Sequence, residues 1–191
     1  QQVVSAPPGL IAASLEETTA TNTPTTNPTP TPGPTPALNP TPTSTVSATG
    51  DANRLVIPKI GLDRPVLFAP VENGTWQVGH LGQAVGYLEG TAPPGSNSNH
   101  VLAGHVTLDV GIYGPFARLG ELVPGDIVIV YEGGQKFFYL VESQRTVKRN
   151  DVTVVYPSVE GQITLITCTT WNNEEGRYSN RLVVKGRLIK G

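Results

Sequence analysis

One cysteine and three histidines are the residues of this sequence that could form a nucleophilic pair. Cys168 is the only cysteine among 191 residues, so no disulfide can form within the chain. Its thiol is either an inert, buried side chain or a nucleophile. A cysteine nucleophile needs a partner that stabilises the thiolate and gives a proton to the leaving group, usually a histidine. The chain offers His80, His100 and His105.

An acyl transfer also needs a donor for the negative charge that develops on the carbonyl oxygen, and a guanidinium can supply it. Arg181 follows Cys168 after the polar stretch TTWNNEEGRYSN. We expect this arginine to open the last strand, across a loop from the thiol. Arg177 lies within the loop and competes for the same role. By residue type alone His105 could be a structural histidine and Arg181 a surface cation.

Short apolar runs separated by glycine and proline must position these side chains. We expect Cys168 to end one such strand and His105 to follow another, because strand ends face loop-lined clefts. A hairpin is predicted across Gly133-Gly134, a pair suited to positive φ. The expected strands are Arg54–Ile60, Pro65–Ala69, Trp76–Val78, His100–Ala103, Asp126–Glu132, Gln135–Lys148, Ile163–Cys168 and Arg181–Lys190.

Helical signal is thin by comparison. Pro115–Leu122, Gln83–Leu88 and Asp151–Tyr156 could each form a turn or two, and no segment sustains the helical apolar period over three turns. Seven or eight short strands with few helices predict an all-β fold, either a closed barrel or a sandwich.

The composition divides the chain into three parts. Ten of its 18 prolines lie between Pro7 and Pro42, in a stretch too poor in apolar side chains to offset the entropy of ordering it. We therefore predict a disordered Thr/Pro-rich linker over 18–50, which acts as a semi-rigid spacer. Residues 1–17 stay unassigned, and 51–191 form the single folding unit.

The charge balance excludes a class of partner. The chain has 13 basic and 15 acidic residues, and only Glu16 and Glu17 of these lie in residues 1–50. The folding unit therefore carries 13 basic and 13 acidic residues. This balance has nothing of the basic stripe of a nucleic-acid-binding protein, so we expect no nucleic-acid partner.

At three points the sequence resembles the sortase family of cysteine transpeptidases. The segment Thr164–Cys168 reads TLITC and matches the TLxTC motif of that family. The segment NHVLAGH is similar to the family's strand that ends in its catalytic histidine, here His105. Arg181, in NRLVV, is similar to the strand-leading arginine of the family. The stretches IPKIG and PFARLGELVPGD agree as well, and the resemblance covers residues 53–190 in the right order.

The resemblance implies a closed eight-stranded β-barrel with one to three short helices, and Cys168, His105 and Arg181 at one end of a groove. Sortases cleave an LPxTG-like sorting signal between Thr and Gly and form a thioester with the cysteine, which an amine then resolves. Carried over, Cys168 attacks, His105 protonates the departing amine and Arg181 stabilises the oxyanion. Thr167 would help to line the substrate site. No cofactor and no metal are expected.

The family also implies partners and a location. The expected partners are surface proteins with a sorting signal, and an amine acceptor that is a peptidoglycan precursor or a pilin. The expected location is the extracellular face of the cell membrane. The chain begins at Gln1 and contains no run of about 18 apolar residues. We therefore expect the membrane tether to lie in an N-terminal segment outside this chain.

Three further hypotheses concern the class within the sortase family and two alternatives to that family. Trp76–Gly95 and the FARLGELVPGD segment favour class E or F over the housekeeping class A enzymes, although His100 stands where we expect a small or apolar residue. An L,D-type transpeptidase is disfavoured because Thr167, not glycine, precedes Cys168. A non-catalytic β-rich surface module on a Thr/Pro stalk, or a degenerate sortase fold, would make the order of Cys, His and Arg a coincidence.

Overall fold

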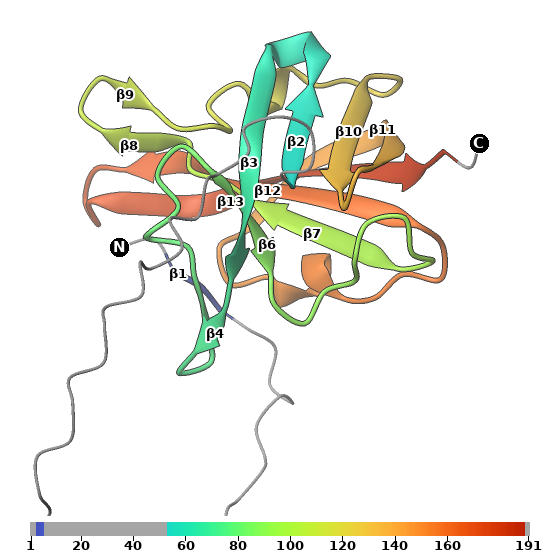
Figure 1. The fold of residues 1–191 in the computed structure, drawn as a ribbon. Helices are drawn as coiled ribbons and strands as arrows, with labels where there is room; N and C mark the ends of the chain where they lie inside the picture. The colour runs from blue at the N-terminus through green and yellow to red at the C-terminus, as the bar shows by residue number, and fades with distance from the viewer. Residues whose placement is uncertain (1–2, 6–52, 190–191) are drawn as a thin grey trace, which may run out of the picture. The chain divides into compact units, whose positions relative to one another are not determined.

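A computed structural model describes residues 3–5 and 53–189 of the chain. Figure 1 shows the fold. The predicted linker over 18–50 lies outside the described residues, as does most of the unassigned segment 1–17. Within that segment β1 (Val3–Ser5) is described, and its backbone pairs antiparallel with β5 (Thr75–Gln77).

Eight strands form a closed barrel in the order β10, β11, β13, β12, β7, β6, β3 and β2, and β2 pairs with β10 to complete it. This confirms the all-β, eight-stranded prediction. The strands are β2 (Arg54–Ile57), β3 (Leu62–Ala69), β6 (Val85–Leu88), β7 (Asn99–Ala103), β10 (Ile127–Glu132), β11 (Gln135–Lys148), β12 (Gln162–Asn172) and β13 (Arg177–Leu188).

A three-stranded sheet and a two-stranded hairpin lie outside the barrel order. The sheet has the order β1, β5 and β4 (Val71–Glu72), and the hairpin is β8 (Thr107–Asp109) with β9 (Ile112–Tyr113). The β8–β9 hairpin follows directly after His105. Figure 1 places it beside the turn that joins β12 to β13. The sequence did not predict β8 and β9, because each is too short to show a period of two.

The predicted hairpin across Gly133-Gly134 is present. Ile127 pairs with Leu140, and the register runs without a shift to the turn. Gly133 and Gly134 have φ values of 55° and 77°. Both therefore lie in the left-handed region that a two-residue turn of this kind requires and that glycine enters without strain.

Two predicted segments were wrong in type. Pro58–Ile60 forms the 3-10 helix η1 instead of continuing the first strand, because Pro58 has no N–H for the ladder and Gly61 ends the turn at φ 64°. Gln83–Leu88 is not helical, since Val85–Leu88 is strand β6. Three of its four residues are buried, and a short buried run cannot be told from a helix by periodicity.

The other short helices agree with the prediction in place. Within Pro115–Leu122, residues Leu119–Glu121 form the 3-10 helix η2. Within Asp151–Tyr156, Val152–Val155 form η3, where the Asp151 carboxylate accepts a hydrogen bond from the Thr153 N–H at 3.0 Å. An aspartate at this position satisfies a backbone donor that the helix leaves unpaired. All three described helices are thus single turns.

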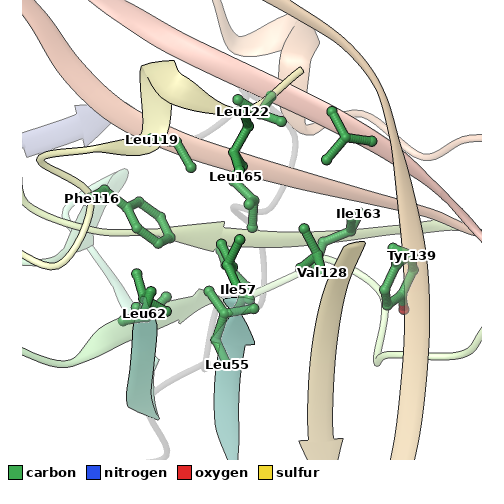
Figure 2. Packing of buried hydrophobic residues seen from close by; sticks show 14 of the residues in the cluster. Leu55, Ile57, Leu62, Phe116, Leu119, Leu122, Val128, Tyr139, Ile163 and Leu165 are labelled. Atoms are coloured by element: carbon green, nitrogen blue, oxygen red, sulfur yellow. The ribbon is translucent and has the colours of Figure 1, made fainter. Parts of the chain in front are cut away.

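The barrel interior holds the main apolar core. Figure 2 shows side chains from β2, β3, β10, β11, β12 and the 116–122 segment pointing toward one another. Leu55, Ile57, Leu102, Leu119, Leu122, Val128 and Leu165 are fully buried there. Phe116, Leu119 and Leu122 belong to the FARLGEL stretch, so this stretch closes the core and at the same time anchors the chain that returns from the β8–β9 hairpin.

A second apolar cluster lies on the outer face of β7, β12 and β13. Side chains of a strand alternate between its faces, and Leu102, Leu165 and Val184 face the barrel core. Their neighbours Val101, Ala103, Ile166 and Val183 therefore point outward. They pack there against Trp76, Val78, Leu81, Val154 and Val155. The β4–β5 hairpin, the 78–81 segment and η3 thus cover this face of the sheet, and the candidate site lies at its end.

Candidate functional site

Cys168 and Arg181 lie directly opposite each other on neighbouring antiparallel strands. Their Cα atoms are partners in the β12–β13 register, which brings their side chains close together on one face of the sheet. Both strands are longer than predicted. Cys168 does not end its strand, because β12 continues to Asn172, and Arg181 does not open its strand, because β13 begins at Arg177. Within β12, the backbone departs from regular strand geometry at Thr170, whose φ is 60°.

His105 reaches the thiol through the parallel pairing of β7 with β12. The ladder ends at the pair Ile166 and Ala103, and two further hydrogen bonds extend it by one residue. The Gly104 N–H donates to the Ile166 carbonyl at 3.1 Å. The Thr167 hydroxyl donates to the Gly104 carbonyl at 2.8 Å. The residue before His105 is thus fixed to the two residues before Cys168.

The backbone around His105 is held equally closely. The His105 carbonyl accepts a hydrogen bond from the Phe116 N–H at 3.0 Å. A Cβ atom added to Gly114 would lie 2.2 Å from that carbonyl oxygen, and one added to Gly104 would lie 2.8 Å from the Phe116 ring. Both positions therefore require glycine because another chain segment passes too closely for a side chain.

The His105 imidazole is oriented by a backbone carbonyl. Its Nε2 lies 2.9 Å from the carbonyl oxygen of Val78. A carbonyl can only accept, so Nε2 carries the proton and Nδ1 is the basic nitrogen of the neutral ring. Val78 follows strand β5 and is itself buried. The 78–81 segment therefore sets both the tautomer and the direction of the ring.

One hollow brings the candidates together. Cys168, His105, Arg181 and Thr167 line it with Val78, Leu81, Ala103, Gly104 and Ile166. Its empty volume is about 290 Å³. The wall is apolar apart from the candidates themselves, so a bound group would meet the thiol, imidazole and guanidinium in a weakly solvated setting. Electrostatic interactions are stronger there than in water.

Burial shifts the two titrating groups in opposite directions. Cys168 is 6% exposed. Its burial raises the pKa of the thiol, and the positive charge of Arg181 opposes that rise. Burial lowers the pKa of His105, which the hydrogen bond to the Val78 carbonyl partly offsets. Desolvation penalises the charged form of each group, so the neutral thiol and neutral imidazole are favoured in the free site.

Arg181 lines the hollow. It is 7% exposed, and its Nη1 donates to the Asn180 carbonyl at 3.1 Å. Its buried Nε has no hydrogen-bond partner within the described part of the chain. A buried donor without an acceptor costs free energy unless a ligand supplies one. The Arg181 guanidinium lies beside the Cys168 thiol and keeps an unused donor, which is suited to stabilise an oxygen that gains negative charge.

The comparisons with known proteins identify the family of this chain. The family model described as Sortase domain matches residues 55–189. The chain belongs to the sortase family. The family resemblance read from TLITC, NHVLAGH and NRLVV is thereby confirmed, while the class E or F assignment stays a prediction.

Individual sortases show how far the similarity extends. The chain is 28% identical over 141 residues to Sortase A of Bacillus anthracis, which covers 71% of this chain and 59% of that protein. The chain thus spans less than two thirds of the length of this relative. Sortase C-1 of Actinomyces oris has 32% identity and a TM-score of 0.61, with 73% of both chains covered. Sortase C of Streptococcus pneumoniae has 29% identity and a TM-score of 0.59, with 72% of this chain and 66% of that chain covered.

The competing candidates of this sortase-family chain lie elsewhere. His100 faces the barrel interior, where its ring stacks on Tyr87 with centroids 5.1 Å apart, and its Nδ1 lies 2.8 Å from the Ala92 carbonyl. His80 is exposed. Arg177 is exposed and ion-paired with Glu175. None of the three lines the hollow around Cys168.

Sequence reasoning missed the contribution of the backbone. The Val78 carbonyl orients His105, and the Gly104 carbonyl binds Thr167. A backbone carbonyl is present at every residue, so its role leaves no mark on residue type at Val78. The only available signal was Gly104, a glycine directly before a candidate histidine at the end of a buried run.

In the described part of the chain, no three His, Cys, Asp or Glu side chains are grouped so that they could hold a metal ion. No helix described there is long and apolar enough to cross a membrane.

Proposed function

We propose that this chain is a cysteine transpeptidase that cleaves a sorting signal of the LPxTG type and transfers the acyl part to an amine. The observation that carries the proposal is the single hollow lined by Cys168, His105 and Arg181, in which the Arg181 Nε has no partner among the described residues. These are the three groups that acyl transfer through a thioester needs: a nucleophile, a proton donor and an oxyanion stabiliser.

In the first half of the reaction, the Cys168 thiolate attacks the carbonyl carbon of the scissile peptide. The carbonyl oxygen becomes an oxyanion, to which Arg181 donates hydrogen bonds. His105, as imidazolium, gives its proton to the departing amine while the C–N bond breaks. The products are a thioester on Cys168, a free amine and a neutral imidazole.

In the second half, an incoming amine attacks the thioester and loses a proton to His105. The C–S bond breaks, the thiolate leaves, and a new amide is formed. The ion pair of thiolate and imidazolium is restored, so the cycle balances in protons and needs no external base. Water in place of the amine would give hydrolysis.

Thr167 has two parts in this proposal. It lines the hollow, which supports the substrate-lining role implied by the family. Its hydroxyl hydrogen is directed to the Gly104 carbonyl, so a substrate would meet the remaining lone pair or the methyl group rather than this donor.

The cellular role follows the same family logic. The substrates are surface proteins with a sorting signal, and the acceptor amine belongs to a peptidoglycan precursor or a pilin. The enzyme works at the extracellular face of the cell membrane, tethered by a segment outside this chain. Class E or F is the proposed class.

The test is incubation with a panel of LPxTG-like peptides and an excess of a small amine such as a glycine oligomer, followed by mass spectrometry. We expect cleavage after Thr and a product that carries the amine. Cys168→Ala should give neither product, because no other side chain in the hollow can form the acyl intermediate. Turnover by Cys168→Ala, or an unreactive Cys168 towards thiol reagents at every pH, would contradict the proposal.

A further inference from the structure

A shallow hollow of positive charge lies where β11 ends, beside the β12–β13 hairpin. Lys148, Arg149, Asn150, Glu175, Arg177 and Ser179 line it. Three cations face one carboxylate, so the hollow carries a net charge of 3 − 1 = +2. The folding unit as a whole has no net charge, which makes this local excess a feature of the site rather than of the chain.

Two carboxylates lie near these cations. Glu175 is already counted in the charge balance and is ion-paired with Arg177. Asp151 lies outside the lining, and its carboxylate accepts hydrogen bonds from the N–H and the hydroxyl of Thr153. Lys148 and Arg149 are exposed and form no ion pair with any described residue. The hollow therefore has two cations available to a ligand.

The hollow meets the sheet face of the candidate catalytic residues through Arg149, Ser179 and Arg177. The Arg149 N–H donates to the Ser179 carbonyl at 3.3 Å, which continues the β11–β13 ladder past Val147 and Arg181. Ser179 and Arg177 precede Arg181 by two and four residues, so they lie on its side of the strand. At about 3.3 Å per residue they begin about 7–13 Å from Arg181.

The direction of the substrate follows from the order of the strands. Across the sheet the order is β7, β12, β13 and β11, so His105, Cys168, Arg181 and the basic hollow follow one another. The departing amine must lie on the His105 side of the thiol, because His105 protonates it. The acyl part of the substrate then extends the other way, past Arg181 and toward the hollow.

We propose that Lys148 and Arg149 form a subsite for an acidic side chain on the acyl side of the sorting signal. This inference rests on the proposed function, which supplies the direction of the substrate. An extended peptide advances about 3.3 Å per residue. The acid should therefore stand two to five residues before the cleaved bond, at the variable position of an LPxTG-like signal or directly before its Leu.

The experiment compares fluorescein-labelled LPxTG-type peptides that carry either Glu or Gln at each of these two positions. Binding to Cys168→Ala is followed by fluorescence anisotropy, and cleavage by the unaltered chain by kcat/KM. We expect the Glu peptide to bind about twofold to fivefold tighter than the Gln peptide at one position, as expected for exposed ion pairs. The preference should decrease between 50 and 500 mM salt.

The charge-removed variant Lys148→Gln/Arg149→Gln should bring the ratio of Glu to Gln close to one. The matched control Lys136→Gln/Arg187→Gln removes the same charge away from the hollow, with Arg187 at the other end of β13, and should keep the ratio. Equal titrations of the Glu and Gln peptides, or a preference that survives in Lys148→Gln/Arg149→Gln, would overturn the subsite. Charge-dependent binding without cleavage of any peptide would instead contradict the proposed function and leave the subsite standing.

Discussion

At the scale of single residues, the site depends on how burial acts on three ionisable side chains. Cys168 and His105 are both buried enough to favour their neutral forms, whereas the proposed reaction needs thiolate and imidazolium. Arg181 is the group that counters this penalty, because its charge favours the thiolate. Arg181 thus supports the ionised form of Cys168, although it forms no covalent bond in the proposed reaction.

Activity should have a bell-shaped pH profile that belongs to the coupled pair. Because the His105 pKa is lowered and the Cys168 pKa is raised, the ion pair is a minor form of the free enzyme, and its population is greatest between the two pKa values. We expect kcat/KM to rise with pH on the acidic limb and fall on the alkaline limb. Rapid thiol alkylation by iodoacetamide, measured alone, should keep rising into the alkaline range. An alkylation plateau below pH 6 would contradict this order.

Arg181→Ala should lower kcat by roughly 10²–10³-fold, as the loss of one oxyanion donor does in other acyl transfers. Arg181→Lys should restore only part of this, because an ammonium lacks the planar fork of donors. Full labelling of Cys168 by a thiol reagent at high pH checks that the site is intact. The control is Arg177→Ala tested on a peptide with Gln at the variable position. A larger defect in Arg177→Ala would show that the arginine was assigned wrongly.

At the scale of elements, one side-chain hydrogen bond replaces a rung of the β7–β12 ladder. Beyond the pair Ile166 and Ala103 the strands separate, since β7 must turn into the β8–β9 hairpin while β12 continues. The Thr167 hydroxyl holds the Gly104 carbonyl across this fork. Thr164, three residues earlier in the same strand, makes a comparable buried bond to the Asn99 side chain at 2.7 Å, remote from the thiol.

Thr167→Val and Thr164→Val should therefore separate stability from catalysis. Thr167→Val removes the bond to Gly104, and Thr164→Val removes the bond to Asn99 together with one accepted from the Gln162 side chain. Each should cost about 1–3 kcal/mol of unfolding free energy, because a carbonyl acceptor loses its donor. Only Thr167→Val should also reduce kcat by about tenfold or more and shift the acidic limb of the pH profile, because His105 loses its register with Cys168. Thr167→Ser should recover most of the activity. Equal kcat losses in Thr164→Val and Thr167→Val would indicate a general loss of stability instead.

The sequence predicted the elements unevenly, for physical reasons. The β10–β11 hairpin was correct because alternation and two glycines act locally. The predicted ends of β12 and β13 were wrong because polar residues such as Asn172 and Ser179 are typical of loops. In the structure these residues belong to strands, because β12 and β13 pair with each other as far as Asn172 and Arg177. Val85–Leu88 was misread because a short buried strand has no polar face to reveal its period.

At the scale of the whole molecule, a buried histidine couples the barrel to pH. His100 is 2% exposed inside the barrel, and its Nε2 has no partner among the described residues. Burial is the main cause that lowers its pKa to about 4. The unfolded chain would bind a proton at His100 near pH 6.5, the ordinary value for histidine, and the folded chain would not until about pH 4.

Stability should therefore fall as the pH decreases from about 6.5 to about 4, because the unfolded state binds more protons over that range. A difference of about 2.5 pKa values corresponds to a loss of about 3 kcal/mol at the acid end. Urea unfolding of the chain and of His100→Gln at pH 7 and pH 4.5 checks this. The variant should be less stable at pH 7 but should lose less stability on acidification. Parallel pH slopes for the two proteins would rule out His100 as the cause.

The sequence by itself determined the family, the eight-stranded fold class and the candidate catalytic side chains. These follow from residue types and their order, which local pattern and motif preserve. Only the tertiary structure decided that Cys168 and Arg181 are mid-strand partners, that the Val78 carbonyl orients His105, and that His100 lies in the core. Each of these depends on register and on which face of a strand meets which neighbour. A shift of one residue reverses every face, and no local sequence signal fixes a register between segments distant in the chain.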